Sequence, residues 1–382
     1  MTADTTFGGL SDAAWDELAG KHFYSTSKWL KFCTAETGTP GSAALSSVGD
    51  GTAWAVPLRE LGGLPLWSRY RWNDRLSEFG LPLLAPTGTL VGPPEGFQTH
   101  FLSTAGDRST SGLASLIAEL RGQRQFDDAS NFGSCVAMYI TSEDVRALRA
   151  AGVRAEPVLL DADAWIPVPE GGWSAWLESL SRNRRKSIRK EDHEFQSAGF
   201  RVVHMPLADC WERLGTAAAG TLLKYGHHTT ADIELVSLNR VVEYLGDAAR
   251  VALCYLGTAS DPVGFCIYYH WGDTIFARWV GFNYDRLLGA AEYFNLCYYT
   301  HLKRAEESGV RWIHAGATAH EAKALRGAEL RPVWLMDLTE NSTLGDSTKL
   351  VRLHNARLYK QFADDPRTNS ALVPVDAWKE FC

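Results

Sequence analysis

The spacing of hydrophobic residues alternates along the first half of the chain between the period of a helix and that of a strand. Apolar residues at helical spacing predict helices over 11–20, 26–37, 111–122 and 143–151. Short apolar runs broken by glycine and proline predict strands and loops between 42 and 105, for example 54–58 and 81–86, and strands over 134–140 and 153–160. This alternation indicates an α/β protein.

The second half begins after residues 167–172, where proline and glycine interrupt both periods. The predicted helices are 173–199, which is long and amphipathic, then 207–223, 231–245, 290–308, 319–326 and 345–366. The predicted strands are 200–205, 250–256, 263–271, 274–282, 310–314 and 333–338. We therefore expect an N-terminal domain over 1–168, a second domain over 169–342 and a helical tail over 343–382.

Composition and length agree with a two-domain globular protein: 382 residues, 45% of them hydrophobic and 22% charged. The N-terminus has acidic residues and no basic segment before an apolar core, so no signal peptide is expected. Because no run of about 18 apolar residues occurs, no membrane span is expected either. The seven cysteines are odd in number and form no CxxC pair, which favours a reducing compartment and hence the cytoplasm.

Charge is distributed unevenly, although the net charge of −7 argues against DNA binding. Residues 182–190 carry six positive charges and no negative one, so the rest of the chain sums to −13. Arg182, Arg185 and Arg189 are three and four residues apart and share one helix face, where guanidinium groups can grip a phosphate. The alternative is a solvated surface helix, helped by Glu178 four residues before Arg182.

A short turn joins the strand 274–282 to the next helix and contains Arg286, Gly289 and Ala291. A strand that leads into a helix presents free N–H groups and a positive dipole to an anion, and small residues let it approach the backbone. The segment therefore predicts an anion site. A plain turn would use glycine equally well.

Several segments resemble the Fem-like branch of the GNAT acyltransferases, labelled as peptidoglycan-biosynthesis or BioF2-like proteins. The segments are 182–190, 221–226, 293–299 and 314–327, the last with a K-x-x-R-G pattern at Lys323. The resemblance covers about 172–338, with a weaker echo at 23–30. It implies tandem GNAT-like domains, each a mixed, mostly antiparallel sheet flanked by helices. It also matches the turn at 286–291 to the R-x-x-G-x-A pattern of GNAT enzymes.

The resemblance implies roles for single residues. Lys323 would stabilise the oxyanion of an acyl-transfer intermediate or hold a phosphate, and Lys224 and Tyr225 would contact substrate. For a general base we consider Glu292 and His314, and also the adjacent histidines His227 and His228. The chain departs from the family with His314 where an acidic residue is common and with Asn295 where glutamate is common.

The leading hypothesis is an amide-forming transferase that moves an aminoacyl group from aminoacyl-tRNA to the amine of a small-molecule or peptide acceptor. An acyl-CoA-dependent N-acyltransferase and a non-catalytic GNAT-fold binding protein are the alternatives. No tightly bound cofactor is expected, because the activated acyl donor is a cosubstrate. A metal is not expected, since His314 and His320 have no obvious third ligand.

Overall fold

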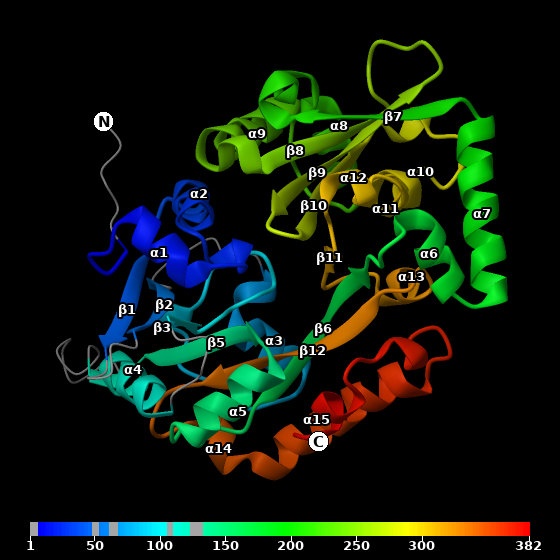
Figure 1. Cartoon of the computed structure of the whole chain (residues 1–382). Coiled ribbons are helices and arrows are strands. Elements are labelled where there is room, and N and C mark those ends of the chain that lie inside the picture. The colour runs from blue at the N-terminus through cyan, green and yellow to red at the C-terminus, as the bar shows by residue number, and fades with distance from the viewer. Residues whose placement is uncertain (1–6, 48–52, 61–67, 105–109, 123–132) are drawn as a thin grey trace. The chain divides into compact units, whose positions relative to one another are not determined.

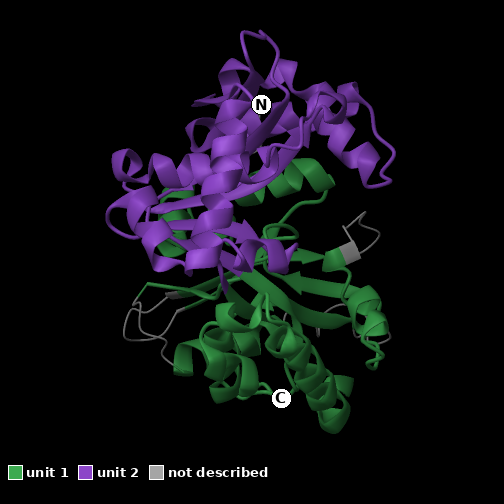
Figure 2. Cartoon of the chain, turned by 90° about the vertical axis from the view of Figure 1, so that its right-hand side faces the viewer, with its two compact units in different colours: residues 1–163, 330–382 green, residues 164–329 purple. Residues whose placement is uncertain are grey.

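The computed structural model describes residues 7–47, 53–60, 68–104, 110–122 and 133–382 (Figure 1). The description leaves out residues 1–6, at the start of the stretch in which no signal peptide is expected. It also leaves out parts of the predicted strand-rich segment 42–105. Contacts divide the chain into unit 1, residues 1–163 and 330–382, and unit 2, residues 164–329 (Figure 2). The boundaries predicted from the sequence lie after residues 168 and 342.

Unit 1 is built on a mixed sheet in the order β1-β2-β3-β5-β12-β6, with β4 paired to β2. Its strands are β1 (Ser42–Ser47), β2 (Ala53–Glu60), β3 (Gly88–Val91), β4 (Leu102–Ser103), β5 (Ser134–Ile140), β12 (Glu329–Asp337) and the first part of β6 (Val158–Pro167). Its helices are α1 (Asp12–Ala19), α2 (Ser27–Thr37), α3 (Trp72–Glu78), α4 (Thr110–Gly122), α5 (Ser142–Ala150), α14 (Thr343–Asp346), α15 (Thr348–Asp364) and α16 (Val375–Lys379).

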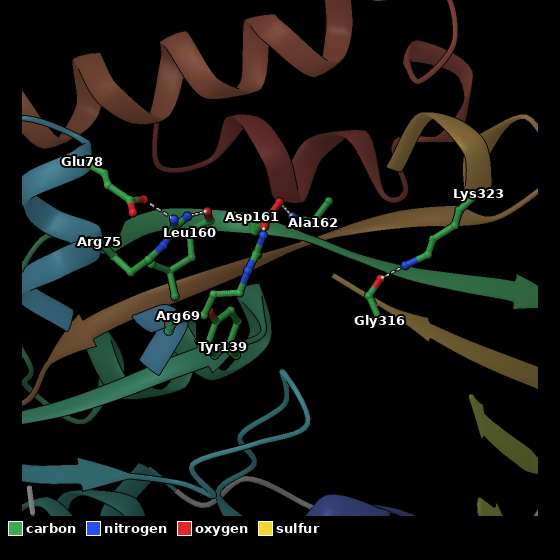
Figure 3. Close-up of polar contacts among 9 residues, drawn as sticks. All are labelled: Arg69, Arg75, Glu78, Tyr139, Leu160, Asp161, Ala162, Gly316 and Lys323. Carbon is green, nitrogen blue, oxygen red and sulfur yellow. Dashed lines mark hydrogen bonds and ion pairs between the residues drawn. The ribbon is translucent and has the colours of Figure 1, made fainter. Parts of the chain in front are cut away.

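Polar side chains fasten the strands of unit 1 to their surroundings. On β6, the Leu159 amide donates to Oδ1 of the buried Asn355 of α15 at 2.8 Å. Further along β6, Arg69 pairs with Asp161 at 3.1 Å, and the Tyr139 hydroxyl of β5 donates to the Arg69 carbonyl (Figure 3). The appended helix expected over 345–366 is thus α15, and it packs within unit 1.

Unit 2 has a sheet in the order β6-β11-β10-β9-β8-β7, in which only β10 and β11 pair in parallel. Its strands, besides the end of β6, are β7 (Phe200–Pro206), β8 (Ala249–Leu256), β9 (Gly264–Trp271), β10 (Thr274–Phe282) and β11 (Trp312–Gly316). Its helices are α6 (Gly172–Ser179), α7 (Arg182–Ser197), α8 (Gly215–Lys224), α9 (Ala231–Leu245), α10 (Glu292–Phe294), α11 (Thr300–Lys303), α12 (Ala305–Ser308) and α13 (His320–Ala324).

Helices cover both faces of the unit 2 sheet. Phe265 and Gly281 face α8, which packs on β10, while α9 packs on β8. Cys266 is the next residue of β9 after Phe265, and it faces Cys297 instead. Cys297 lies in a π-helical turn (Asn295–Tyr299) between α10 and α11. Since neighbouring residues of a strand point to opposite faces, the two helical layers lie on opposite sides of this sheet. The predicted α/β fold class, with mostly antiparallel sheet flanked by helices, is confirmed.

The helix expected over 207–223 begins only at Gly215, after two 3-10 turns, and the strand expected over 153–160 begins only at Val158. Three further predictions of single elements are wrong, each for a local reason. The helix expected over 173–199 breaks into α6 and α7, because Leu180 and Ser181 have extended backbone. The helix expected over 290–308 contains the π-helical turn and breaks at Arg304. The strand expected over 81–86 is irregular, since its prolines lack N–H donors and the Asn73 side chain bonds both backbone groups of Leu84.

Candidate functional site

The parallel pairing of β10 and β11 is short. Residues 274–276 of β10 pair with 312–314 of β11, after which β10 has a bulge between Ala277 and Trp279. β11 pairs on its other side with β6 and has its own irregularity between His314 and Gly316. Residues 277–280 are half-buried although they lie mid-strand. Beyond this pairing β10 and β11 separate, so their backbone polar groups there can meet a ligand. Bulges such as the one in β10 are common next to functional sites.

Lys323 of α13 lies at the end of β11, where the sequence analysis expects it. Its side chain is only 2% exposed, and its Nζ donates to the Gly316 carbonyl at 2.9 Å (Figure 3). This contact takes one of the three donors of the ammonium group. A buried lysine is rare unless it is paired, and here the side chain is held beside the point where β10 and β11 separate.

His314 lies on β11, two residues before Gly316, and is 1% exposed. Its ring contacts Trp165 of β6, with centroids 4.8 Å apart, and Phe276 of β10 at 5.4 Å. The structure thus brings two predicted site residues, His314 and Lys323, to the same end of one strand. His314 is set between aromatic rings there.

The turn at 286–291 forms as expected between β10 and α10, but a carboxylate already contacts it. Glu292 is buried, and its Oε1 accepts a hydrogen bond from the Leu288 amide at 2.7 Å. Gly289 and Ala291 both have positive φ, of 73° and 57°. Arg286 donates to the Asp261 carbonyl at 3.4 Å. Glu292 thus closes the turn, in the way that a bound anion would.

A buried ionic network, which was not predicted from the sequence, surrounds Arg326. This guanidinium is 7% exposed and donates to Glu191 of α7 at 2.7 Å and to the Tyr299 hydroxyl at 2.9 Å. It lies over the Phe294 ring at 3.1 Å from the centroid, and the Tyr299 hydroxyl also donates to Glu191. Burial is the largest cause that raises the pKa of Tyr299, so this phenol stays protonated. The network ties α7 to the segment after α13.

The arginines of α7 are placed differently from one another. Arg182 and Arg189 are exposed, as a phosphate site requires. Arg185 is half-buried and donates to the Glu178 carbonyl at 2.9 Å. The unpredicted Arg184 donates to the Ala324 carbonyl of α13 at 3.0 Å. The basic helix is therefore attached to the segment that carries Lys323, with two arginines directed outward.

The end of α8 holds the remaining predicted residues. Lys224 lies over the Tyr284 ring, 3.8 Å from its centroid, in the segment between β10 and the turn. Tyr225 is 70% exposed, and His227 and His228 are exposed as well. The structure thus brings Lys224 beside the turn at 286–291 and leaves the other three on the surface.

Within the described ranges, no three histidine, cysteine or acidic side chains are grouped as ligands for a metal ion. No helix in the described part of the chain is both long and apolar enough to cross a bilayer.

Comparison with known proteins gives one family match and several matches of fold. The model of the FemAB-like family, described as peptidoglycan biosynthesis/recognition, matches residues 93–360. The crystal structure of FemX is similar with a TM-score of 0.58 at 10% identity, covering 88% of this chain and 98% of that chain. L-PGS from Bacillus licheniformis has a TM-score of 0.50 at 12% identity, covering 86% and 96%. No curated protein matches the sequence.

Proposed function

Because this chain belongs to the FemAB-like family, we propose that it transfers an aminoacyl group from aminoacyl-tRNA to an amine acceptor, forming an amide. The acceptor is a small molecule or peptide. Its amine nitrogen attacks the ester carbonyl carbon, the C–N bond forms and the ester C–O bond breaks. The tRNA leaves with a free terminal hydroxyl that takes up the proton lost by the amine. No further activation is needed, since the ester supplies it.

The observation that carries this proposal is the buried Lys323 at the divergence of β10 and β11. An acyl transfer builds negative charge on the carbonyl oxygen, and a fixed cation in a site with little water stabilises that charge. The Gly316 carbonyl fixes the ammonium group in place, so little reorganisation is required when the charge develops.

We assign the tRNA phosphates to the outward arginines of α7, Arg182 and Arg189, together with the half-buried Arg185. Lys224 and Tyr225 at the end of α8 are proposed as substrate contacts. His314 is proposed as a base for the acceptor amine, since it lies on the strand whose end Lys323 contacts. Glu292 is the weaker candidate for a base, because it already accepts from Leu288. The proposal places the enzyme in the cytoplasm, where tRNA is charged.

An acyl-CoA-dependent transfer is the second candidate and relies on the turn with Arg286, Gly289 and Ala291. Gly289 is exposed, and nothing lies within 4 Å of where its Cβ would be, so a phosphate could approach the backbone there. The Leu288 amide is already engaged by Glu292, however, and pyrophosphate would have to displace that carboxylate. CoA is therefore the less favoured of the two candidate donors.

The test uses the full chain with tRNA charged with radiolabelled amino acid and a panel of amines. We expect label to appear in an amide product, and RNase treatment of the donor beforehand to abolish it. An amide yield that is unaffected by RNase would refute the tRNA donor. Isothermal titration with CoA then separates the alternatives, since saturable CoA binding supports the second donor. If neither donor supports transfer, the hypothesis of a non-catalytic binding protein is favoured.

A further inference from the structure

A second group of polar side chains lies on one face of the unit 2 sheet. In the strand register, Arg250 of β8 is opposite Tyr268 of β9 and Pro206 of β7, and His204 is two residues before Pro206. Side chains two apart on a strand share a face, so His204, Arg250 and Tyr268 project from the same side. Helix α11 covers this side with Thr300 and His301.

Direct contacts join these side chains into one cluster. Nδ1 of His204 lies 3.0 Å from the Tyr268 hydroxyl, and its Nε2 lies 2.7 Å from Oγ1 of Thr300. The ring of His301 lies 4.5 Å from that of Tyr268 and 5.4 Å from that of His204, measured between centroids. His301 is 1% exposed, and its Nε2 has no hydrogen-bond partner among the described residues. A buried polar atom of this kind requires a partner.

The cluster is surrounded by positive charge. Burial first, then the guanidinium groups of Arg304 and Arg250, lower the pKa of His204 to about 3. Burial, His204, Arg304 and His270 lower the pKa of His301. Burial raises the pKa of the Tyr268 phenol, and a side-chain hydrogen bond from Arg250 opposes this rise. Both imidazoles are therefore neutral at physiological pH and can donate without adding charge.

The cluster also reaches solvent. Arg304 is 47% exposed and pairs with the largely exposed Glu307 at 3.8 Å, at the limit of an ion pair. Arg250, His204 and His270 are half-buried. An exposed and a half-buried guanidinium group thus lie next to a buried ring nitrogen that has no hydrogen-bond partner among the described residues, which is the composition of a site for a compact oxyanion.

We propose that His204, Arg250, Tyr268, His301 and Arg304 form a binding site for a phosphate group, either inorganic phosphate or a small phosphate monoester. The two arginines supply charge-assisted hydrogen bonds. His301 donates from Nε2, and Tyr268 orients the ligand from the floor of the site. A dianion with several acceptor oxygens matches this number of donors better than a carboxylate does.

This site is separate from the proposed transfer site. None of its residues is assigned to the transfer site: His204, Arg250 and Tyr268 lie on β7, β8 and β9, and His301 lies on α11 with Arg304 directly after it, whereas Lys323 contacts the end of β11. Failure of the transfer assay would therefore not affect the phosphate site, and neither result depends on the other.

The test is isothermal titration of the full chain at low salt with inorganic phosphate and, separately, glycerol 3-phosphate. We expect saturable one-site binding of at least one of them, weakened about tenfold or more by Arg250→Gln and by Arg304→Gln, since each removes a charge-assisted hydrogen bond. Arg311→Gln is the matched control, because Arg311 is an exposed arginine of unit 2 paired with Glu170. A melting curve for each variant excludes misfolding.

The two ligand arms identify the source of the phosphate. Binding of inorganic phosphate alone indicates free phosphate, and tighter binding of the monoester indicates a phosphorylated metabolite. The proposal is overturned if neither ligand binds, or if Arg311→Gln weakens binding as much as the other two variants do.

Discussion

Replacing Lys323 by methionine tests the proposed reaction most directly. Methionine keeps a long, unbranched chain in the buried site and removes only the ammonium group, so the cavity left is small. If the charge stabilises the oxyanion, kcat should fall by about 10² to 10³, which corresponds to about 2.7–4 kcal/mol of transition-state stabilisation, while both KM values stay nearly unchanged.

Stability provides the second observable for this variant. Loss of the 2.9 Å contact leaves the Gly316 carbonyl without that donor, which should cost about 1–3 kcal/mol of unfolding free energy. Urea unfolding measures this cost, and steady-state kinetics with charged tRNA measures kcat. The matched control is Lys303→Met, a partly exposed lysine of the same unit paired with Asp192, which should keep full activity.

Three outcomes for Lys323→Met have different meanings. A loss in kcat alone supports the oxyanion role. A rise in donor KM that grows with added salt would assign the lysine to a donor phosphate instead. A folded variant with wild-type kcat and KM would refute both roles and remove the main residue-level support for the proposed transfer.

Further predictions concern the stability of unit 2. Glu191→Gln removes the charge that faces Arg326 at 2.7 Å and should lower the unfolding free energy by about 1–3 kcal/mol in urea titration; a change below about 0.5 kcal/mol contradicts a structural role. Because the folded pKa of His204 is about 3, below its ordinary 6.5, only the unfolded state gains this proton as pH falls below 6.5. Stability should therefore decrease by up to about 1.4 kcal/mol per pH unit towards pH 3, and His204→Asn should flatten that slope; an equal slope in both proteins contradicts the assignment. Gly327 has a φ of 78°, and an added Cβ would lie 2.6 Å from Cδ2 of Leu180. Gly327→Ala should therefore cost about 1–3 kcal/mol, and an unchanged Tm would show that the turn relaxes.

The sequence predicts most strands of unit 2 because their apolar runs are bounded by turn residues, as at 257–262 and 272–273. It does not predict the break between α6 and α7. Leu180 is buried like Trp176 and Leu177, so the apolar spacing continues through the break. Ser181 was the one residue here that could have indicated the break, because serine is typical of helix N-caps and Ser181 is the N-cap of α7.

The candidate site was predictable only in part. Lys323 could be placed because it follows a strand end closely in the chain. Its contact with Gly316 spans only seven residues. The pairing of Glu191 with Arg326 spans 135 residues, and no local pattern relates such distant positions. The separation of β10 from β11 likewise depends on where pairing stops, which hydrophobic spacing does not encode.

The division of the chain has a consequence for synthesis on the ribosome. Unit 2 is continuous, so all of its strands have emerged once residue 329 leaves the exit tunnel. Unit 1 at that moment still lacks β12, which pairs with β5 through residues 334–337, and α15, whose Asn355 binds the backbone of β6. Since contiguous domains can fold as they are translated, the inserted unit can complete its core before the unit that surrounds it in sequence. The N-terminal strands must stay competent to accept a partner that is synthesised about 190 residues after β5.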